Sequence, residues 1–304
     1  MDIGRILAIT VGASDLDIME HTYAKYLGYR SVKSGFISHD EAHNWGAEKL
    51  IDAPYIIMQP EKSDDFSFRF ILQPKQSNYI PFTTYGWNAA EVIVEDVDAL
   101  EEIIQESSFE IIGSPADLSF TSDIRAMQVI GPAQEILYLT QFKRKIKEFD
   151  SPTPRCSVDQ TFIVILAGKS IDSMQEYYAR EFNLRKSPIM ESRIRSISKA
   201  FNLPEETKYN AAAIAIKDQC LIELDEMPKE ASKRSTMKGY LSPGISIVSF
   251  KLYDKKKIFN GYNTQLPNLE QSQCLIKRGL GNELIELISD WVRMIAFLKY
   301  ETDT

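Results

Sequence analysis

The feature of this sequence that most constrains its fold is an internal repeat. The segment TFIVILAGKSIDSMQEYYAREFNL, beginning at Thr161, aligns without gaps with the opening segment of the chain, so that Tyr178 falls on Tyr23. Each copy has a β-branched apolar run followed by apolar residues at helical spacing, a pattern typical of a strand that leads into a helix. The repeat predicts that the chain is built from copies of one small unit.

Four copies can be traced along the 304 residues, each with a strand, a helix and further strands. Between the second and third copies lies KRKIKEFDSPTPRCS, a charged, proline-containing segment that is typical of a linker. We therefore expect two domains, 1–147 and 155–304, each made of two adjacent copies. The fourth copy, which opens with GISIVSFKLYD, has a poorly preserved helix and is degenerate.

Composition excludes several classes of partner. The chain has 43 acidic and 35 basic residues and a formal net charge of -8, which opposes binding to nucleic acid or to anionic lipid. No apolar run reaches membrane-spanning length, and the N-terminus does not resemble a secretory signal. Cys156, Cys220 and Cys274 are far apart and predict neither a disulfide framework nor a zinc site. We expect a cytoplasmic protein with reduced thiols.

Motifs within the copies carry a family resemblance. They are a strand run leading into a helix that starts with Leu-Asp or Ile-Asp, an aromatic pair further along, and a closing strand of the form GPxxEIxYL or GNELIEL; they occur in Ile9–Tyr23, Gly86–Asp98, Gly131–Thr140, Phe162–Tyr178 and Gly281–Leu287. The chain resembles the vicinal oxygen chelate superfamily of glyoxalase I, the bleomycin-resistance proteins and the extradiol dioxygenases. The resemblance implies an α+β, glyoxalase-like fold in which four tandem βαβββ modules pair into two half-open barrels, each with a ligand cavity.

The resemblance also implies where a metal would bind. In the metal-dependent members the ligands lie on the first and last strands of each module. Here the first-strand positions are apolar, at Ala8, Ala89, Ile163 and near Ile247, and the last-strand positions fall on Arg69, Tyr138, Glu223 and Glu286. Without an imidazole at any of these positions we expect no metal and no other cofactor. If a metal is bound, its ligands are Glu223 and Glu286, which we expect to face one cavity in the second domain as a working pair or as the remnant of a decayed site.

Strand alternation places a polar set on one face of the first-domain strands, opposite a face of aliphatic and phenylalanine side chains. We predict three catalytic residues there: Glu91 for proton transfer, Tyr138 as a donor, and Arg69 to orient a carboxylate or an enolate oxygen. Ser67, Gln73 and Trp87 are predicted to contact substrate. The alternative is that Arg69 and Glu91 form a buried structural ion pair.

The segment SHDEAHNWG, residues 38–46, predicts a short helix that begins after Ser38 and has His39 and His43 on one side. A solvated helix is one interpretation. The other is a lid in which Trp45 and His43 reach the substrate.

Three functions fit these observations. The first is a metal-independent isomerase, lyase or hydratase that acts by acid/base chemistry on an aromatic or oxo-acid-like small molecule. The second is a binding or sequestration protein resembling the bleomycin-resistance proteins, and the third, less favoured because histidines are missing, is an extradiol-type metal-dependent dioxygenase. Four modules in one chain can complete both barrels, so a homodimer is possible but not required.

Overall fold

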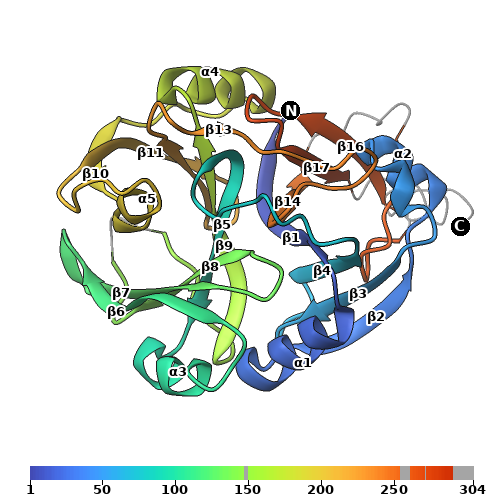
Figure 1. Cartoon of the computed structure of the whole chain (residues 1–304), viewed down its shortest axis with the longest axis horizontal. Coiled ribbons are helices and arrows are strands. Elements are labelled where there is room, and N and C mark those ends of the chain that lie inside the picture. Colours follow the sequence, from blue (N-terminus) through green and yellow to red (C-terminus); the bar gives the residue numbers. More distant parts are fainter. Residues whose placement is uncertain (147–149, 254–260, 271, 290–304) are drawn as a thin grey trace, which may run out of the picture.

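The structure is a computed structural model that describes residues 1–146, 150–253, 261–270 and 272–289. Four modules follow one another along the chain (Figure 1). Module 1 contains β1 (Ile3–Ala13), α1 (Leu16–Leu27), β2 (Arg30–Phe36), α2 (His39–Trp45), the 3-10 helix η1 (Glu48–Leu50), β3 (Pro54–Gln59) and β4 (Ser67–Leu72). Module 2 contains β5 (Thr84–Val94), α3 (Val97–Ile104), β6 (Glu110–Leu118), β7 (Thr121–Ile130) and β8 (Ile136–Phe142).

Modules 3 and 4 repeat this order. Module 3 contains β9 (Val158–Gly168), α4 (Ile171–Phe182), β10 (Met190–Arg193), α5 (Arg195–Ala200), β11 (Lys208–Ile216) and β12 (Cys220–Glu226), and the short β13 (Ser232–Lys233) follows. Module 4 contains β14 (Ile245–Leu252), β15 (Tyr262–Asn263), β16 (Gln273–Arg278) and β17 (Leu284–Ser289). The eroded helix expected in module 4 covers residues 255–271; residues 255–260 and 271 lie outside the described residues, and 261–270 contain β15 and no helix.

The strands form two curled sheets that lie side by side (Figure 1). One sheet has the order β15-β16-β17-β14-β1-β4-β3-β2 and joins modules 1 and 4; we call it barrel 1–4. The other has the order β10-β11-β12-β9-β5-β8-β7-β6 and joins modules 2 and 3; we call it barrel 2–3. The predicted α+β fold of βαβββ modules in two half-open barrels is confirmed.

The expected pairing of adjacent modules is wrong. Strand β1 pairs antiparallel with β14, with Ile9 opposite Val248, and β5 pairs antiparallel with β9, with Ala90 opposite Val164. Each barrel therefore contains strands from both sides of the linker. The division into independently folding domains, 1–147 and 155–304, stays a prediction.

The main core lies where the convex faces of the two sheets and the helices meet. Helix α1 begins at its N-cap Asp15, whose side chain accepts a hydrogen bond from the Ile18 amide, and ends at Gly28 in the left-handed conformation. Its buried Met19 and Tyr23 pack in one apolar cluster with residues of both barrels. Helix α4 does the same from module 3, as the repeat predicts.

Two equivalent hydrogen bonds connect the barrels. The hydroxyl of Tyr23 on α1 donates to Glu135 in the β7–β8 turn at 3.0 Å, and that of Tyr178 on α4 donates to Glu283 in the β16–β17 turn at 3.1 Å. Each carboxyl also accepts a backbone N–H of its own turn. Burial raises the pKa of both glutamates to about 7.

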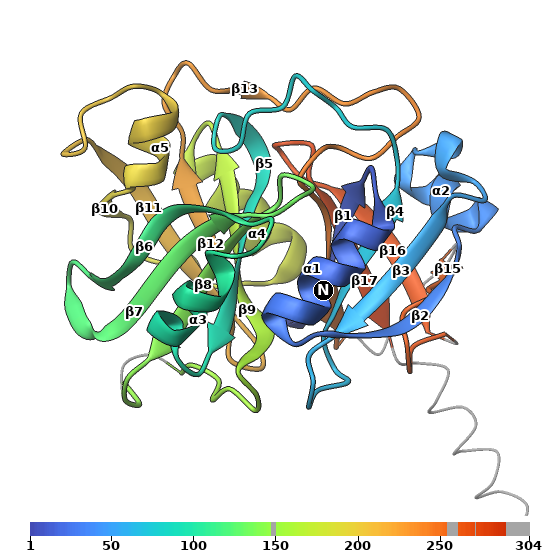
Figure 2. The same cartoon turned by 60° about the horizontal axis from the view of Figure 1, so that its bottom comes forward.

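Two connections cross from one barrel to the other along the same end of the molecule (Figure 2). Arg234, in the connection between β12 and β14, is buried and donates to the carbonyls of Trp87, Pro243 and Ile245. Its guanidinium lies 4.9 Å from the ring centroid of Tyr79, which belongs to the other connection. Arg234 thus joins both connections, as Gln73 and Gln76 do through their hydrogen bonds to the backbone of Leu241 and Met237. No helix among the described residues is long and apolar enough to span a membrane.

We expect Tyr23→Phe and Tyr178→Phe each to lower the free energy of unfolding by about 1–3 kcal/mol, because a buried carboxyl loses a donor. The matched control is Tyr26→Phe on the same helix, whose half-exposed hydroxyl donates to the Glu106 carbonyl; its change should stay within about 0.5 kcal/mol. Urea denaturation measures all three. Equal changes in the three variants would contradict a linking role for these bonds.

The observed pairing also predicts how fragments behave. Fragment 1–147 has β1 and β5 but lacks β14 and β9, so two long strand edges lose their partners. We expect fragments 1–147 and 155–304 to be unfolded or aggregated when separate and to regain native circular dichroism when refolded together. A folded, monomeric fragment 1–147 would instead support the division into two domains.

Candidate functional site

The interior of barrel 1–4 is organised around Arg69 on β4. Its Nε donates to Thr10 Oγ1 at 2.9 Å, and its Nη2 donates to Glu286 Oε2 on β17 at 3.2 Å. A second carboxylate, Glu41 on α2, lies 3.7 Å from Nη1, beyond hydrogen-bond distance. All three charged side chains are fully buried.

Helix α2 closes this barrel. Ser38 and Glu41 form a capping box at its start, and Trp45 near its end is buried, with its indole N–H donating to Tyr262 Oη at 3.0 Å. The Arg69 guanidinium lies 4.8 Å from the Trp45 ring centroid. Burial raises the pKa of Glu41, while Arg69 favours its ionised form. Barrel 1–4 is therefore filled by its own side chains and offers no room for a substrate at Arg69.

A metal of the family type does not fit barrel 1–4. Glu286 is the one carboxylate on its first and last strands at the implied ligand positions, and Tyr262, Ser249 and Arg69 already donate to its two oxygens. The implied ligand position on the last strand of module 1 is Arg69, whose guanidinium lies beside Glu286 and would repel a metal cation. In barrel 2–3 the implied positions offer Glu223 without an imidazole. Among the described residues, no group of three histidine, cysteine or acidic side chains is arranged to hold a metal ion.

Barrel 2–3 differs because three polar residues of its interior remain partly exposed. On β5 the residues Ala90, Val92 and Val94 belong to the core between the barrels, so Glu91 points to the concave side. The same alternation places Tyr138 of β8 and Glu223 of β12 on that side. All three are partly exposed to solvent, although they lie near the middle of the sheet. This interior is accessible, whereas that of barrel 1–4 is closed.

The carboxyls of barrel 2–3 hold protons more tightly than ordinary glutamates. Burial, together with the neighbouring Glu223, raises the pKa of Glu91 to about 8. Burial raises the pKa of Glu223 to about 7, and burial with the Glu223 charge raises that of Asp225. Burial also raises the pKa of the Tyr138 phenol. Near neutral pH this group can both accept and donate protons.

The structure divides the predicted site between the two barrels. Arg69 lies in barrel 1–4, whereas Glu91 and Tyr138 lie in barrel 2–3, so the alternative Arg69–Glu91 ion pair does not form. Glu286 and Glu223 are likewise in different barrels, which corrects the expectation that they share a cavity. The cause in both cases is the pairing of module 1 with module 4.

The side chains that were predicted to contact substrate make other contacts instead. Trp87 is buried in the core between the barrels, with its indole N–H donating to the Leu284 carbonyl, because a β-bulge between Trp87 and Ala89 reverses the alternation. Ser67 accepts a hydrogen bond from Gln59, and Gln73 bonds the backbone of Leu241.

Helix α2 has features of both the solvated helix and the lid that the sequence suggested. Trp45 reaches into the barrel, as the lid interpretation predicts, but it seals the interior. His43 is exposed and stacks on His39 at the surface, with ring centroids 6.0 Å apart. The histidines therefore do not face the barrel interior.

Sequence reasoning missed the roles of Glu41 and Asp225. The Ser38-x-x-Glu41 spacing, which is that of a capping box, could have indicated that Glu41 turns back toward the start of its helix rather than to solvent. Asp225 lies two residues after Glu223 on the same strand, so alternation could have placed both on one face.

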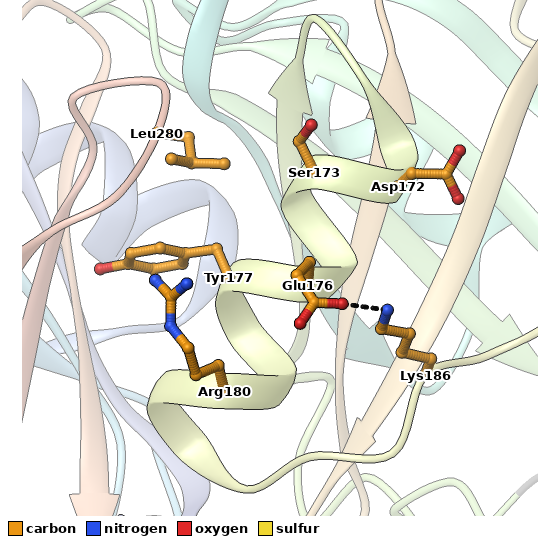
Figure 3. A pocket seen from close by; sticks show the side chains of 7 residues that line it. All are labelled: Asp172, Ser173, Glu176, Tyr177, Arg180, Lys186 and Leu280. Carbon is orange, nitrogen blue, oxygen red and sulfur yellow. Dashed lines mark hydrogen bonds and ion pairs between the residues drawn. The ribbon is translucent and has the colours of Figure 1, made fainter.

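A groove of about 430 Å³ also runs along the outside of α4, between Tyr177 and Leu280 (Figure 3). Its charged residues are exposed, and Lys186 is paired with Glu176. The groove lies outside both barrels and receives no buried polar group, so it is not the candidate site.

Comparisons with known proteins agree with this architecture. No protein-family model and no curated protein matches the sequence. Among solved structures, glyoxalase I from Zea mays superposes with a TM-score of 0.60 at 14% identity, covering 96% of this chain and 95% of that chain. A candidate dioxygenase from Bacillus subtilis gives a TM-score of 0.58 at 12% identity, covering 95% of this chain and 86% of that chain. At these identities the likeness establishes the fold.

We expect Arg69→Met to lower the free energy of unfolding by about 3–5 kcal/mol, because Glu286 then remains buried without its cation. Arg69→Met/Glu286→Leu should recover part of this loss, because Glu286 is removed while the buried Glu41 still lacks its cation. Chemical denaturation of the two variants measures the difference. A double variant no more stable than Arg69→Met would contradict the view that the pair is a structural plug.

Proposed function

We propose that this protein, whose fold is that of the vicinal oxygen chelate superfamily, is a metal-independent enzyme of the isomerase, lyase or hydratase type. Its reaction is acid/base chemistry on a small molecule in barrel 2–3. The observation that carries the proposal is the pair Glu91 and Glu223, which come from two modules, face one accessible interior and have a raised pKa. A carboxyl that titrates near the working pH is suited to proton transfer.

In the proposed reaction each group has a role. Glu91, on the central strand β5, removes a proton from an activated carbon of the substrate and returns it. Tyr138, directly across the parallel pair from Glu91, donates a hydrogen bond to an oxygen that gains charge. Glu223 raises the pKa of Glu91 and thereby increases its strength as a base.

The substrate class that we propose is narrower than the aromatic or oxo-acid-like class expected from the sequence. An oxo-acid needs a cation to bind its carboxylate, and the predicted cation Arg69 is closed within barrel 1–4 by Glu286 and Glu41. The interior of barrel 2–3 instead has aromatic and aliphatic walls that include Phe142, Phe162 and Ile163. Aromatic or other apolar substrates fit this lining, whereas carboxylates do not.

Binding without chemistry is the second candidate function. The observation that favours it is the apolar lining, which gives affinity to a ring without any proton transfer. The two functions differ in whether Glu91 exchanges a proton with the bound molecule.

Solvent-deuterium exchange tests this difference, because it detects proton removal from a bound molecule whether or not a full reaction follows. Aromatic ketones and amines with an acidic C–H are incubated with the protein in D₂O, and exchange is followed by NMR. We expect Glu91→Gln to slow exchange by about 10²–10⁴-fold, because general-base catalysis is lost. The rate should rise with pH and level off above about 8, since the base must be deprotonated.

The matched control is Glu283→Gln, which alters a buried glutamate with a similarly raised pKa outside the barrels and should leave exchange unchanged. Unaltered exchange in Glu91→Gln would rule out the assigned role. Ligands that bind barrel 2–3 without any exchange would support the binding function.

A further inference from the structure

The starting observation is an imbalance of charge inside barrel 2–3. Glu91, Glu223 and Asp225 share its concave side, and none of them forms an ion pair with a basic residue of the described part of the chain. Isolated charges of one sign are costly in such a position unless a cation accompanies them.

One polar atom in this interior also has no partner. Asp225 Oδ1 is buried without a hydrogen bond, and the residue is 2% exposed. Asp225 lies two residues after Glu223 on β12, and its strand partner Ala167 belongs to the apolar lining of this interior, so alternation directs Asp225 to the same side as Glu223. A buried carboxylate oxygen without a donor requires N–H or O–H groups, which a bound molecule can supply.

Barrel 1–4 provides an internal comparison for this interior. The strand registers pair Thr10 with Arg69 and Ser249 with Glu286 in barrel 1–4. They pair Glu91 with Tyr138 and Ile165 with Glu223 at the corresponding places in barrel 2–3. When module 2 is placed on module 1 and module 3 on module 4, Glu223 corresponds to Glu286, Glu91 to Thr10, and Tyr138 to Arg69.

In barrel 1–4 the Arg69 guanidinium therefore lies between Thr10 and Glu286, which are the counterparts of Glu91 and Glu223. Arg69 bonds both Thr10 and Glu286 there. In barrel 2–3 the corresponding residue, Tyr138, has no charge, and Glu91 adds a second carboxyl. Barrel 1–4 thus has the Arg69 cation in its interior, whereas no basic side chain among the described residues pairs with the carboxyls of barrel 2–3.

We propose that barrel 2–3 binds an organic cation, an ammonium or guanidinium group carried on an apolar, ring-sized body. The charged group occupies the place that the Arg69 guanidinium has in barrel 1–4, against Glu223 and Glu91. The body packs on the wall formed by Phe142 and Phe162, whose ring centroids are 5.8 Å apart. The inference rests on the proposed function, because it names the charge class of the molecule that the same site would transform.

Binding is measured by thermal shift and calorimetry with three probes of similar shape and different charge. They are phenethylamine, 2-phenylethanol and 3-phenylpropanoate, each at 10 mM. We expect only the amine to stabilise the protein, since ligand bound to the folded state raises the melting temperature.

The ionisable side chains around the cation are Tyr85 and Glu91 on β5, Tyr138 on β8, Tyr209 on β11, and Glu223 and Asp225 on β12.

The amine should bind more tightly as pH rises from 6 to 8.5. It stays charged over this range, whereas the carboxyls of Glu223 and Glu91 lose their protons near pH 7 and pH 8. Each proton released on binding increases the affinity up to about tenfold per pH unit below the pKa.

Three variants locate the site. Glu223→Gln should weaken amine binding at least about tenfold, as expected for the loss of a partly buried ion pair. Glu283→Gln should leave it unchanged. Tyr138→Arg introduces the guanidinium that barrel 1–4 already has, and should leave the protein folded while abolishing amine binding.

The results that overturn the proposal are distinct from those that overturn the proposed function. Stronger stabilisation by the alcohol or the carboxylate, no stabilisation by the amine at any pH, or amine binding that survives Tyr138→Arg would each rule out a cation ligand. Displacement of the amine by micromolar Mn²⁺ or Mg²⁺ would show a metal site instead. Deuterium exchange that depends on Glu91 and needs no added metal would still support the proposed function in each of these cases.

Discussion

Two antiparallel pairings, β1 with β14 and β5 with β9, determine which side chains share an interior. Each module has its first strand at an open edge, and such an edge requires a partner strand. Pairing the outer modules with each other brings Arg69 to Glu286 across 217 positions of sequence. It leaves the inner modules to form a barrel in which Glu91 meets Glu223.

The two barrels therefore represent two outcomes of one duplicated arrangement. In barrel 1–4 the last strands supply one cation and one anion, and α2 covers both with Trp45. In barrel 2–3 the last strands supply Tyr138 and Glu223, and the first strand adds Glu91. A closed ion pair contributes to structure, whereas an accessible group of carboxyls without a cation is available to a ligand.

Much of this fold could be predicted from local sequence. Module boundaries and the inward direction of Glu91 and Tyr138 follow from periodicity and repeat alignment, and the last-strand position of Glu286 follows from the family resemblance. The partner of each module could not be predicted, because every first strand has a similar apolar pattern and none specifies its neighbour. The direction of Trp87 was predicted wrongly because a β-bulge next to it inserts an extra residue, and strict alternation takes no account of such an insertion.

A raised pKa alone does not distinguish function from structure in this molecule. Glu135 and Glu283 titrate near pH 7, as Glu223 does, yet each accepts a tyrosine hydroxyl and a backbone N–H in a closed turn. A Cβ added at Gly131 would lie 1.8 Å from Glu135 Oε1, so that turn is shaped around its carboxyl. Glu91 and Glu223 differ in two respects, since solvent reaches them and no basic side chain of the described residues pairs with them. Accessibility combined with unbalanced charge, rather than burial, is therefore the basis on which we propose barrel 2–3 as the site.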